Sequence, residues 1–113
     1  MLEYGADVNA KNDNGETALD WTSVTGHIEP VKLLLEYGAD VNVKNNYGNT
    51  PLYYASSYGH TEVVKILLEN GTDVNIKNDD GDTALICASE CASEEGYTEI
   101  VKLLIEHGAK FNV

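Results

Sequence analysis

Apolar and charged residues alternate along the chain with the spacing of amphipathic helices. Three stripes place apolar residues at i, i+3 and i+4: Val31, Leu34 and Leu35; Val64, Leu67 and Leu68; Val101, Leu104 and Ile105. The opposite side of each stripe carries Glu and Lys three or four residues apart, in the set Glu29, Lys32, Glu36, Glu62, Lys65, Glu69, Glu99, Lys102 and Glu106. We expect helices near residues 29–37, 62–70 and 99–107, with the stripes buried and the charged sides in water.

A shorter helix is expected before each of these. Thr17, Thr50 and Thr83 stand at N-cap positions, and the next residues, Ala18, Pro51 and Ala84, suit the first helical position. We predict first helices near residues 18–25, 51–58 and 84–95 that end at Gly26, Gly59 and Gly96. Gly38, Gly71 and Gly108 are expected to end the second helices. Small residues on the first helices allow close packing: Thr22, Ser23, Ala55, Ser56, Ala88 and Ser89.

Clusters of Asn and Gly separate the helix pairs at residues 12–15, 45–48 and 78–81. Because Asn and Gly tolerate positive φ, these clusters predict hairpin-like loops. Gly15, Gly48 and Gly81 are 33 residues apart, and the three capping threonines repeat with the same period. A fixed period of this length indicates an all-α repeat solenoid, in which each unit packs on the next.

The motifs within each copy resemble those of the ankyrin repeat. They include Thr-Pro-Leu at 50–52, Gly-His at 26–27 and 59–60, and Gly-Ala-Asp-Val-Asn at 5–9 and 38–42. The resemblance covers the whole chain and implies helix-turn-helix units with hairpin-like loops, stacked in an L-shaped array. We predict one domain over 1–113, with a partial repeat at 1–11 and full repeats at 12–44, 45–77 and 78–113.

Some positions depart from the family pattern. Asp20, Tyr53 and Ile86 replace the histidine that usually follows Thr-Pro-Leu, and Asp20 is expected to form a capping box with Thr17. Pro30 falls in the first turn of a second helix, where proline is tolerated. Lys110 and Phe111 replace the usual Asp and Val of the last copy.

The third copy contains a direct duplication, in which Cys-Ala-Ser-Glu occurs at 87–90 and again at 91–94. Four residues are about 400° of helix, so an added turn keeps the small residues nearly in phase. We therefore expect a four-residue insertion that lengthens the first helix continuously from Ala84 through Glu94.

The charge of the chain restricts its partners. Nineteen acidic residues against seven basic ones give a net charge of −12, and every basic residue is lysine. Nucleic acid and anionic membranes are therefore not expected as partners, whereas a basic protein is. The alternative is that the acidity only keeps the protein soluble.

Cellular location is expected to be intracellular and cytoplasmic. No apolar run is long enough to span a bilayer, and the first residues lack the features of a signal or transit peptide. Two cysteines four residues apart, Cys87 and Cys91, fit a reducing compartment better than a disulfide framework.

Catalytic and metal sites are not expected, and neither is a cofactor. His27, His60 and His107 lie at helix ends on separate copies, so we interpret them as forming hydrogen bonds at these helix ends rather than as convergent metal ligands. Cys87 and Cys91 lack a third soft ligand, the loops around 12–16 and 78–82 lack the EF-hand spacing, and no nucleotide or hydrolase motif is present. The sequence therefore indicates a binding module rather than an enzyme.

The ankyrin resemblance implies that a protein partner docks on the concave surface formed by the loops and first helices. The candidate contacts are Asp13, Asn14, Glu16, Asn46, Tyr47, Asn49, Asp79, Asp80 and Asp82 on the loops, and Trp21, Val24, Thr25, Tyr54, Ser57 and Tyr58 on the first helices. Trp21 and Tyr54 either contact the partner or pack between repeats. An adaptor is the favoured function, and the alternatives are a spacer in a longer array or the targeting arm of an enzyme.

The two ends of the chain suggest a further expectation. The chain begins inside what would be a second helix and stops at Val113 without a polar closing repeat. Solenoids need polar caps, so we expect either a fragment of a longer array or end-to-end self-association.

Overall fold

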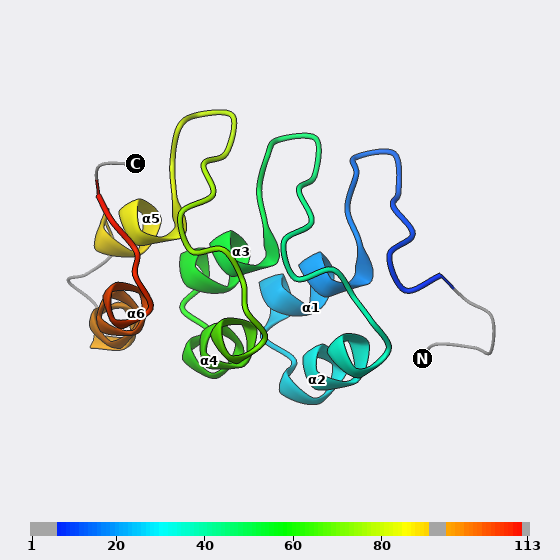
Figure 1. The fold of residues 1–113 in the computed structure, drawn as a ribbon, viewed down its shortest axis with the longest axis horizontal. Helices are drawn as coiled ribbons and strands as arrows, with labels where there is room; N and C mark the ends of the chain where they lie inside the picture. The colour runs from blue at the N-terminus through cyan, green and yellow to red at the C-terminus, as the bar shows by residue number, and fades with distance from the viewer. Residues whose placement is uncertain (1–6, 91–94, 112–113) are drawn as a thin grey trace.

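Helices of the protein are paired, and the pairs are stacked side by side. The computed structural model describes residues 7–90 and 95–111, and in these residues it forms helices but no β-strand. The pairs are α1 (Ala18–Thr25) with α2 (Ile28–Glu36), α3 (Pro51–Ser57) with α4 (Thr61–Glu69), and α5 (Ala84–Glu90) with α6 (Glu95–Glu106). Figure 1 shows α1, α3 and α5 in one layer, α2, α4 and α6 in a second, and long loops projecting from the side of the first layer. The architecture is an all-α repeat solenoid, as predicted.

Each first helix begins at its threonine cap, as predicted. The hydroxyl oxygens of Thr17, Thr50 and Thr83 accept hydrogen bonds from the backbone N–H three residues later, at 3.4, 3.2 and 3.3 Å. Pro51 occupies the first turn of α3, where its missing N–H costs nothing. The predicted helix starts therefore follow from local chemistry at the caps.

Glycines end most of the helices in the predicted way. Gly26 has φ of 77° and ends α1, and Gly38, Gly71 and Gly108 follow the second helices with φ of 91°, 79° and 94°. The prediction for Gly96 was wrong, because α6 begins at Glu95 and Gly96 lies in its first turn. The second helix of the third repeat thus starts four residues before the predicted residue 99.

The duplicated segment is only partly described. α5 covers Ala84–Glu90 as predicted, and the rest of the expected continuous helix, residues 91–94, lies outside the described residues. α6 begins directly after this segment, at Glu95.

The hydrophobic core lies between the two layers of helices. Leu19, Leu52 and Leu85 of the first helices and Leu67 and Leu104 of the second helices have 1% or less of their surface exposed. The predicted stripes are buried in α4 and mostly in α2, but Ile105 of α6 is 50% exposed and the prediction for it was wrong. Its counterpart Leu68 lies in α4, which contacts α6 of the next repeat, and is 7% exposed; no helix follows α6 among the described residues.

Neighbouring repeats are joined by side-chain hydrogen bonds at two levels. Asn9, Asn42 and Asn75 each accept the backbone N–H of the next repeat's loop, from Asp40, Asp73 and Lys110, at 2.7, 2.7 and 3.0 Å. At the ends of the first helices, the His60 ring (Nε2) lies 2.8 Å from the Val24 carbonyl, and the Tyr97 hydroxyl donates to the Ser57 carbonyl at 2.8 Å. These bonds fix the register between repeats and so position the loops.

Candidate functional site

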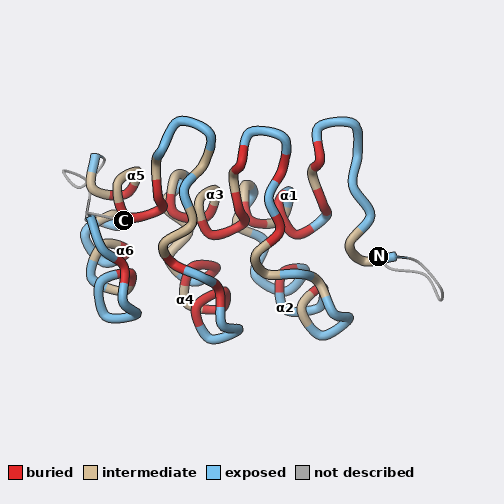
Figure 2. Tube along the Cα trace, turned by 45° about the horizontal axis from the view of Figure 1, so that its top comes forward, coloured by how far each residue is buried: buried red, intermediate tan, exposed pale blue. Residues whose placement is uncertain are grey.

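Three hairpin loops lie side by side along one edge of the molecule. We call the hairpin face the surface formed by their tips, residues 12–16, 45–49 and 78–82, together with the exposed and partly exposed residues of α1 and α3 and Tyr58, which follows α3. Figure 2 shows that the outermost part of each loop is exposed, in contrast to the buried segments nearer the helices. The predicted contact residues all belong to this face.

Each hairpin is closed by an asparagine at the same position of its repeat. The side-chain oxygens of Asn12, Asn45 and Asn78 each accept two backbone N–H groups, two and four residues later, at 2.9–3.0 Å. The backbone N–H of the same residue donates to the carbonyl four residues on, which closes the loop from the other side. The asparagine side chain thus satisfies backbone N–H groups that no neighbouring strand pairs, and it holds the loop in one conformation.

Adjacent hairpins are bonded to one another. Asn46 N–H donates to the Asn14 carbonyl at 2.9 Å, and Asp79 N–H donates to the Tyr47 carbonyl at 3.0 Å. The Asn46 side chain also donates to the Asp13 carbonyl at 3.0 Å. The three tips are therefore one continuous row rather than three independent loops.

Glycine is required where the hairpins touch. Gly48 has φ of 77°, and a Cβ on it would lie 2.9 Å from the backbone nitrogen of Asp79 and 3.0 Å from the Cα of Asn78. Gly81 has φ of 79° but no atom within 4 Å of such a Cβ. The close approach, and not only the turn, therefore depends on glycine at position 48.

The predicted contact residues differ in how free they are to bind a partner. Asp13, Asn14, Tyr47, Asp79 and Asp80 are exposed on the tips, as are Thr25 and Tyr58 on the first helices. Glu16, Val24, Ser57 and Asp82 are partly exposed. The side chains of Asn46 and Asn49 form hydrogen bonds within the protein. Asn46 donates to the Asp13 carbonyl. The Asn49 oxygen accepts from the Asn78 side chain at 2.9 Å, and the Asn49 amide donates to the Tyr54 hydroxyl at 3.3 Å.

Trp21 and Tyr54 occupy the same position in successive repeats but differ in environment. Trp21 is 55% exposed, so the packing alternative does not describe it. Tyr54 is partly buried, and its hydroxyl accepts hydrogen bonds from the side chains of Asn45 and Asn49 at the base of the second hairpin. Tyr54 therefore braces the hairpin against α3.

Two titratable groups in the first helices have shifted pKa values. Asp20 forms the predicted capping box, with its Oδ2 accepting the Thr17 N–H at 3.0 Å. Burial raises the pKa of Asp20 to about 6 against the lowering effect of these Thr17 hydrogen bonds. Burial also raises the pKa of Tyr53 to about 12, with a further contribution from the neighbouring Cys87 thiol.

Histidines lie at helix ends, and the rings of two of them contact backbone carbonyls there, as expected. His60 contacts the end of α1 through the Val24 carbonyl, and the His107 ring (Nδ1) lies 2.8 Å from the Leu103 carbonyl of its own helix. His27 is exposed at the N-cap of α2 and makes no capping side-chain bond there.

Charge is distributed unevenly over the molecule. The ion pairs found among the described residues, Glu29 with Lys32 at 3.6 Å and Glu62 with Lys65 at 3.4 Å, both lie on the second helices. On the first and third hairpins, Asp13, Asp79 and Asp80 are exposed carboxylates that form no ion pair within residues 7–90 and 95–111. The hairpin face therefore has negative charge that is not compensated internally.

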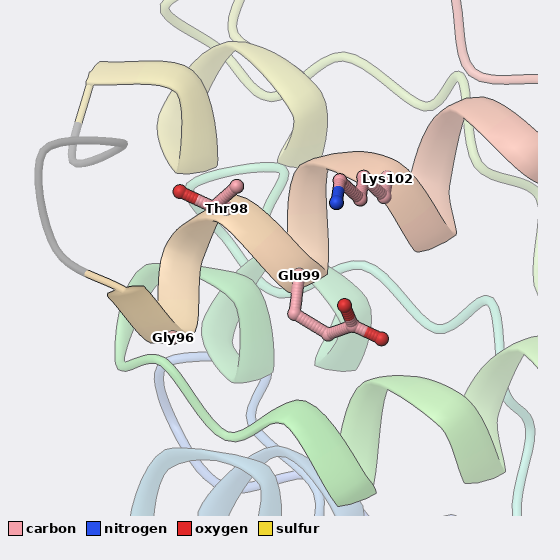
Figure 3. Close-up of a pocket in the computed structure, with 4 residues that line it drawn as sticks. All are labelled: Gly96, Thr98, Glu99 and Lys102. Atoms are coloured by element: carbon pink, nitrogen blue, oxygen red, sulfur yellow. The ribbon is translucent and has the colours of Figure 1, made fainter.

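Depressions in the surface are also found away from the hairpins. Figure 3 shows described residues that border one of about 620 Å³ at the start of α6: Gly96, Thr98, Glu99 and Lys102. A second depression, of about 300 Å³, lies between α2 and α4 and is bordered by Lys32, Leu35, Glu36, Ile66, Glu69 and Asn70.

Metal and membrane sites were also considered. In the described part of the chain, no group of three or more His, Cys, Asp or Glu side chains could hold a metal ion. Cys87 is a free, partly buried thiol, and Cys91 lies outside the described residues, so the joint cysteine site is not tested. No helix in residues 7–90 or 95–111 combines the length and apolar character that crossing a bilayer requires.

Several residues that position the face were not singled out from the sequence. Asn9, Asn42 and Asn75 join the loops of successive repeats, and Tyr97 takes over in the third repeat the contact that His60 makes in the second. A signal for the asparagines was present, since they recur with the 33-residue period. Their role depends on bonds between repeats, which a pattern within one repeat does not reveal.

Comparison with known proteins covers the full length of the chain. The family model described as ankyrin repeats (3 copies) matches residues 1–78 and 44–113. A search of curated proteins finds no match.

Proposed function

The chain belongs to the ankyrin-repeat family, and from this membership we propose that it is a non-catalytic adaptor that holds a protein partner on its hairpin face. Ankyrin repeats are general protein–protein interaction modules. The observation that carries the assignment to this face is the bonded row of hairpins, whose tips are rigid yet expose side chains to solvent. A rigid surface loses little conformational entropy on binding, which favours affinity.

The chemistry of the proposed partner follows from the side chains on this face. Trp21, Tyr47 and Tyr58 are 55%, 59% and 56% exposed, and exposed aromatic residues are the usual anchors of protein interfaces. The uncompensated carboxylates of the first and third hairpins favour a basic partner. We therefore propose that the partner presents a basic, partly apolar surface.

A kinetic binding assay tests this proposal, with a partner isolated by affinity capture from the source cell. Replacing Tyr47 and Tyr58 by Ala should weaken binding by about 2 kcal/mol or more, chiefly through a faster off-rate. Lys32→Ala and Lys65→Ala on the second helices are the matched controls and should change affinity little. A larger effect of the lysines than of the tyrosines would place the partner on the opposite side of the molecule.

Self-association is a second proposal, and it concerns the third repeat. Ile105 and Phe111 are 50% and 55% exposed, whereas their counterparts Leu68 and Val74 are each 7% exposed. We propose that this apolar end mediates contact between copies of the chain.

A further inference from the structure

We infer that the hairpin face fits an extended polypeptide segment with two basic clusters about six residues apart and an apolar or aromatic centre. The inference rests on the proposed function, since it assumes that a partner binds this face. It goes further by assigning a charge pattern and a spacing to that partner.

The charge of the hairpin row changes sign along its length. The first hairpin carries Asp13 and Glu16, and the third carries Asp79, Asp80 and Asp82. The second hairpin has no carboxylate, because Asn46, Tyr47 and Asn49 occupy the equivalent positions. A lysine precedes each hairpin (Lys11, Lys44 and Lys77), so the row reads negative, positive, negative. A cation is therefore attracted at both ends and repelled at the centre.

The centre of the row instead offers the ring of one tyrosine. Tyr47 is 59% exposed on the tip of the second hairpin, and its backbone carbonyl accepts the Asp79 N–H of the third hairpin at 3.0 Å. Because the backbone at Tyr47 is held in the row, its ring presents apolar area at low entropic cost and favours a matching apolar side chain. Tyr58 lies at the other end of α3 from the hairpin and does not belong to this centre.

The spacing of the two basic clusters follows from the stacking. Each hairpin contributes two chain segments to the row, and hydrogen-bonded segments lie about 4.8 Å apart, which places neighbouring hairpins about 10 Å apart. The first and third hairpins are then about 20 Å apart. An extended chain advances about 3.3 Å per residue, so about six residues connect the two clusters.

An extended segment fits this face better than a helix does. A helix bound in a groove needs a continuous apolar stripe on its receptor. Apart from Trp21, Tyr47 and Tyr58, the exposed residues of the predicted contact set are polar. Backbone groups of an extended segment can bond to such polar side chains, for example Asn14 on the first hairpin.

Fluorescence anisotropy with synthetic peptides tests the inference on the intact chain. The first peptide has two lysine clusters separated by about six residues with Tyr and Leu at the centre. Isomers of the same composition place the clusters together or at the centre, and a longer peptide separates them by about thirteen residues, the number that a helix would need to span the same distance. We expect the first peptide to bind at least about tenfold tighter than each of the others, at low and at physiological salt.

Matched variants assign the two clusters to the two ends of the row. Asp79→Asn with Asp80→Asn, and separately Asp13→Asn with Glu16→Gln, should each reduce the advantage of the first peptide to about threefold or less. Glu29→Gln with Glu62→Gln removes the same number of charges from the second helices and should leave the advantage unchanged.

Equal affinity for all peptides, or an equal effect of the second-helix variant, would overturn the inference and indicate attraction by net charge alone. Tightest binding of the peptide with the longer spacer would also overturn it and indicate a helical partner. The proposed function fails separately, if the captured partner is insensitive to Tyr47→Ala with Tyr58→Ala.

Discussion

Asp20 shows how a single residue can be favourable at a helix start and costly in the core. Its side chain completes the capping box with Thr17, but the residue is only 2% exposed and its Oδ1 has no hydrogen-bond partner among the described residues. In the family pattern this position is a histidine, whereas here a carboxylate must be buried to cap the helix. The stability of the first repeat should therefore depend on pH.

The sign of this dependence follows from the raised pKa. Because the pKa of Asp20 is about 6 in the folded protein and 3.8 ordinarily, the folded state binds the proton more tightly than the unfolded chain. This contribution to the free energy of unfolding is present below about pH 3.8 and is lost as the pH rises to about 6. Its size is at most about 3 kcal/mol.

Asp20→Asn removes the titration and keeps an oxygen that can accept the Thr17 N–H. We expect the free energy of unfolding of the variant, relative to the natural chain, to rise by about 2 kcal/mol between pH 4.5 and pH 7. Urea titrations at several pH values measure it. Asp13→Asn removes one exposed carboxylate and controls for net charge, and an identical pH profile for both variants would refute the assignment.

At the scale of elements, the hairpin row is the feature that couples one repeat to the next on the binding side. Its bonds join backbone groups of neighbouring hairpins, so they form only if each loop keeps its shape. Two glycines with nearly equal φ, Gly48 and Gly81, differ in whether another hairpin lies against them. Replacing each glycine by alanine therefore distinguishes the free-energy cost of a Cβ at positive φ from the cost of a Cβ that meets the next hairpin.

Gly81→Ala should destabilise the protein by about 1 kcal/mol, the cost of a left-handed conformation for a residue with a Cβ. Gly48→Ala should cost about 2–3 kcal/mol, because its Cβ also displaces the backbone of the third hairpin. Denaturant unfolding measures both, provided that the slope with denaturant is unchanged. Equal losses for the two variants would show that the hairpins do not need their close contact.

The sequence predicted the elements whose signals are local. Thr17, Thr50 and Thr83 marked the starts of the first helices because a cap is a contact within a few residues. The prediction that Gly96 ends a helix was wrong, because Gly96 matches the motif of Gly26 and Gly59 but lies inside a helix that starts at Glu95. The prediction that Ile105 is buried was wrong, because burial in a solenoid depends on the neighbouring repeat and not on the apolar stripe alone. Which of the predicted contact residues bind a partner stays a prediction.

At the scale of the whole molecule, stability comes from contacts between neighbours. The principal helix contacts are within a pair or between adjacent pairs, such as α1 with α3 and α2 with α4. No helix follows α6 among the described residues, and Ile105 and Phe111 are exposed there. The net charge of −12 opposes association of copies through these residues.

Light scattering over a range of concentrations tests the association. We expect a concentration-dependent increase in mass that grows with added salt, because salt screens the repulsion between acidic chains. Ile105→Ser with Phe111→Ser should abolish the increase, whereas Lys102→Ser on the outer side of α6 should not. A strictly monomeric species at high concentration would exclude association.

The junction between α5 and α6 has a practical consequence for protein engineering. Each first helix begins beside its hairpin and leads away from it, so α5 ends at Glu90 on the side remote from the hairpin row (Figure 1). The third repeat carries four additional residues here, yet Tyr97 still reaches the Ser57 carbonyl as His60 reaches that of Val24. The chain thus already contains an insertion that leaves the register intact. A fluorescent reporter or an affinity tag grafted at this junction would label the third repeat at the position that follows Thr25 and Ser57 in the other repeats, and it would leave the hairpin tips free for a partner.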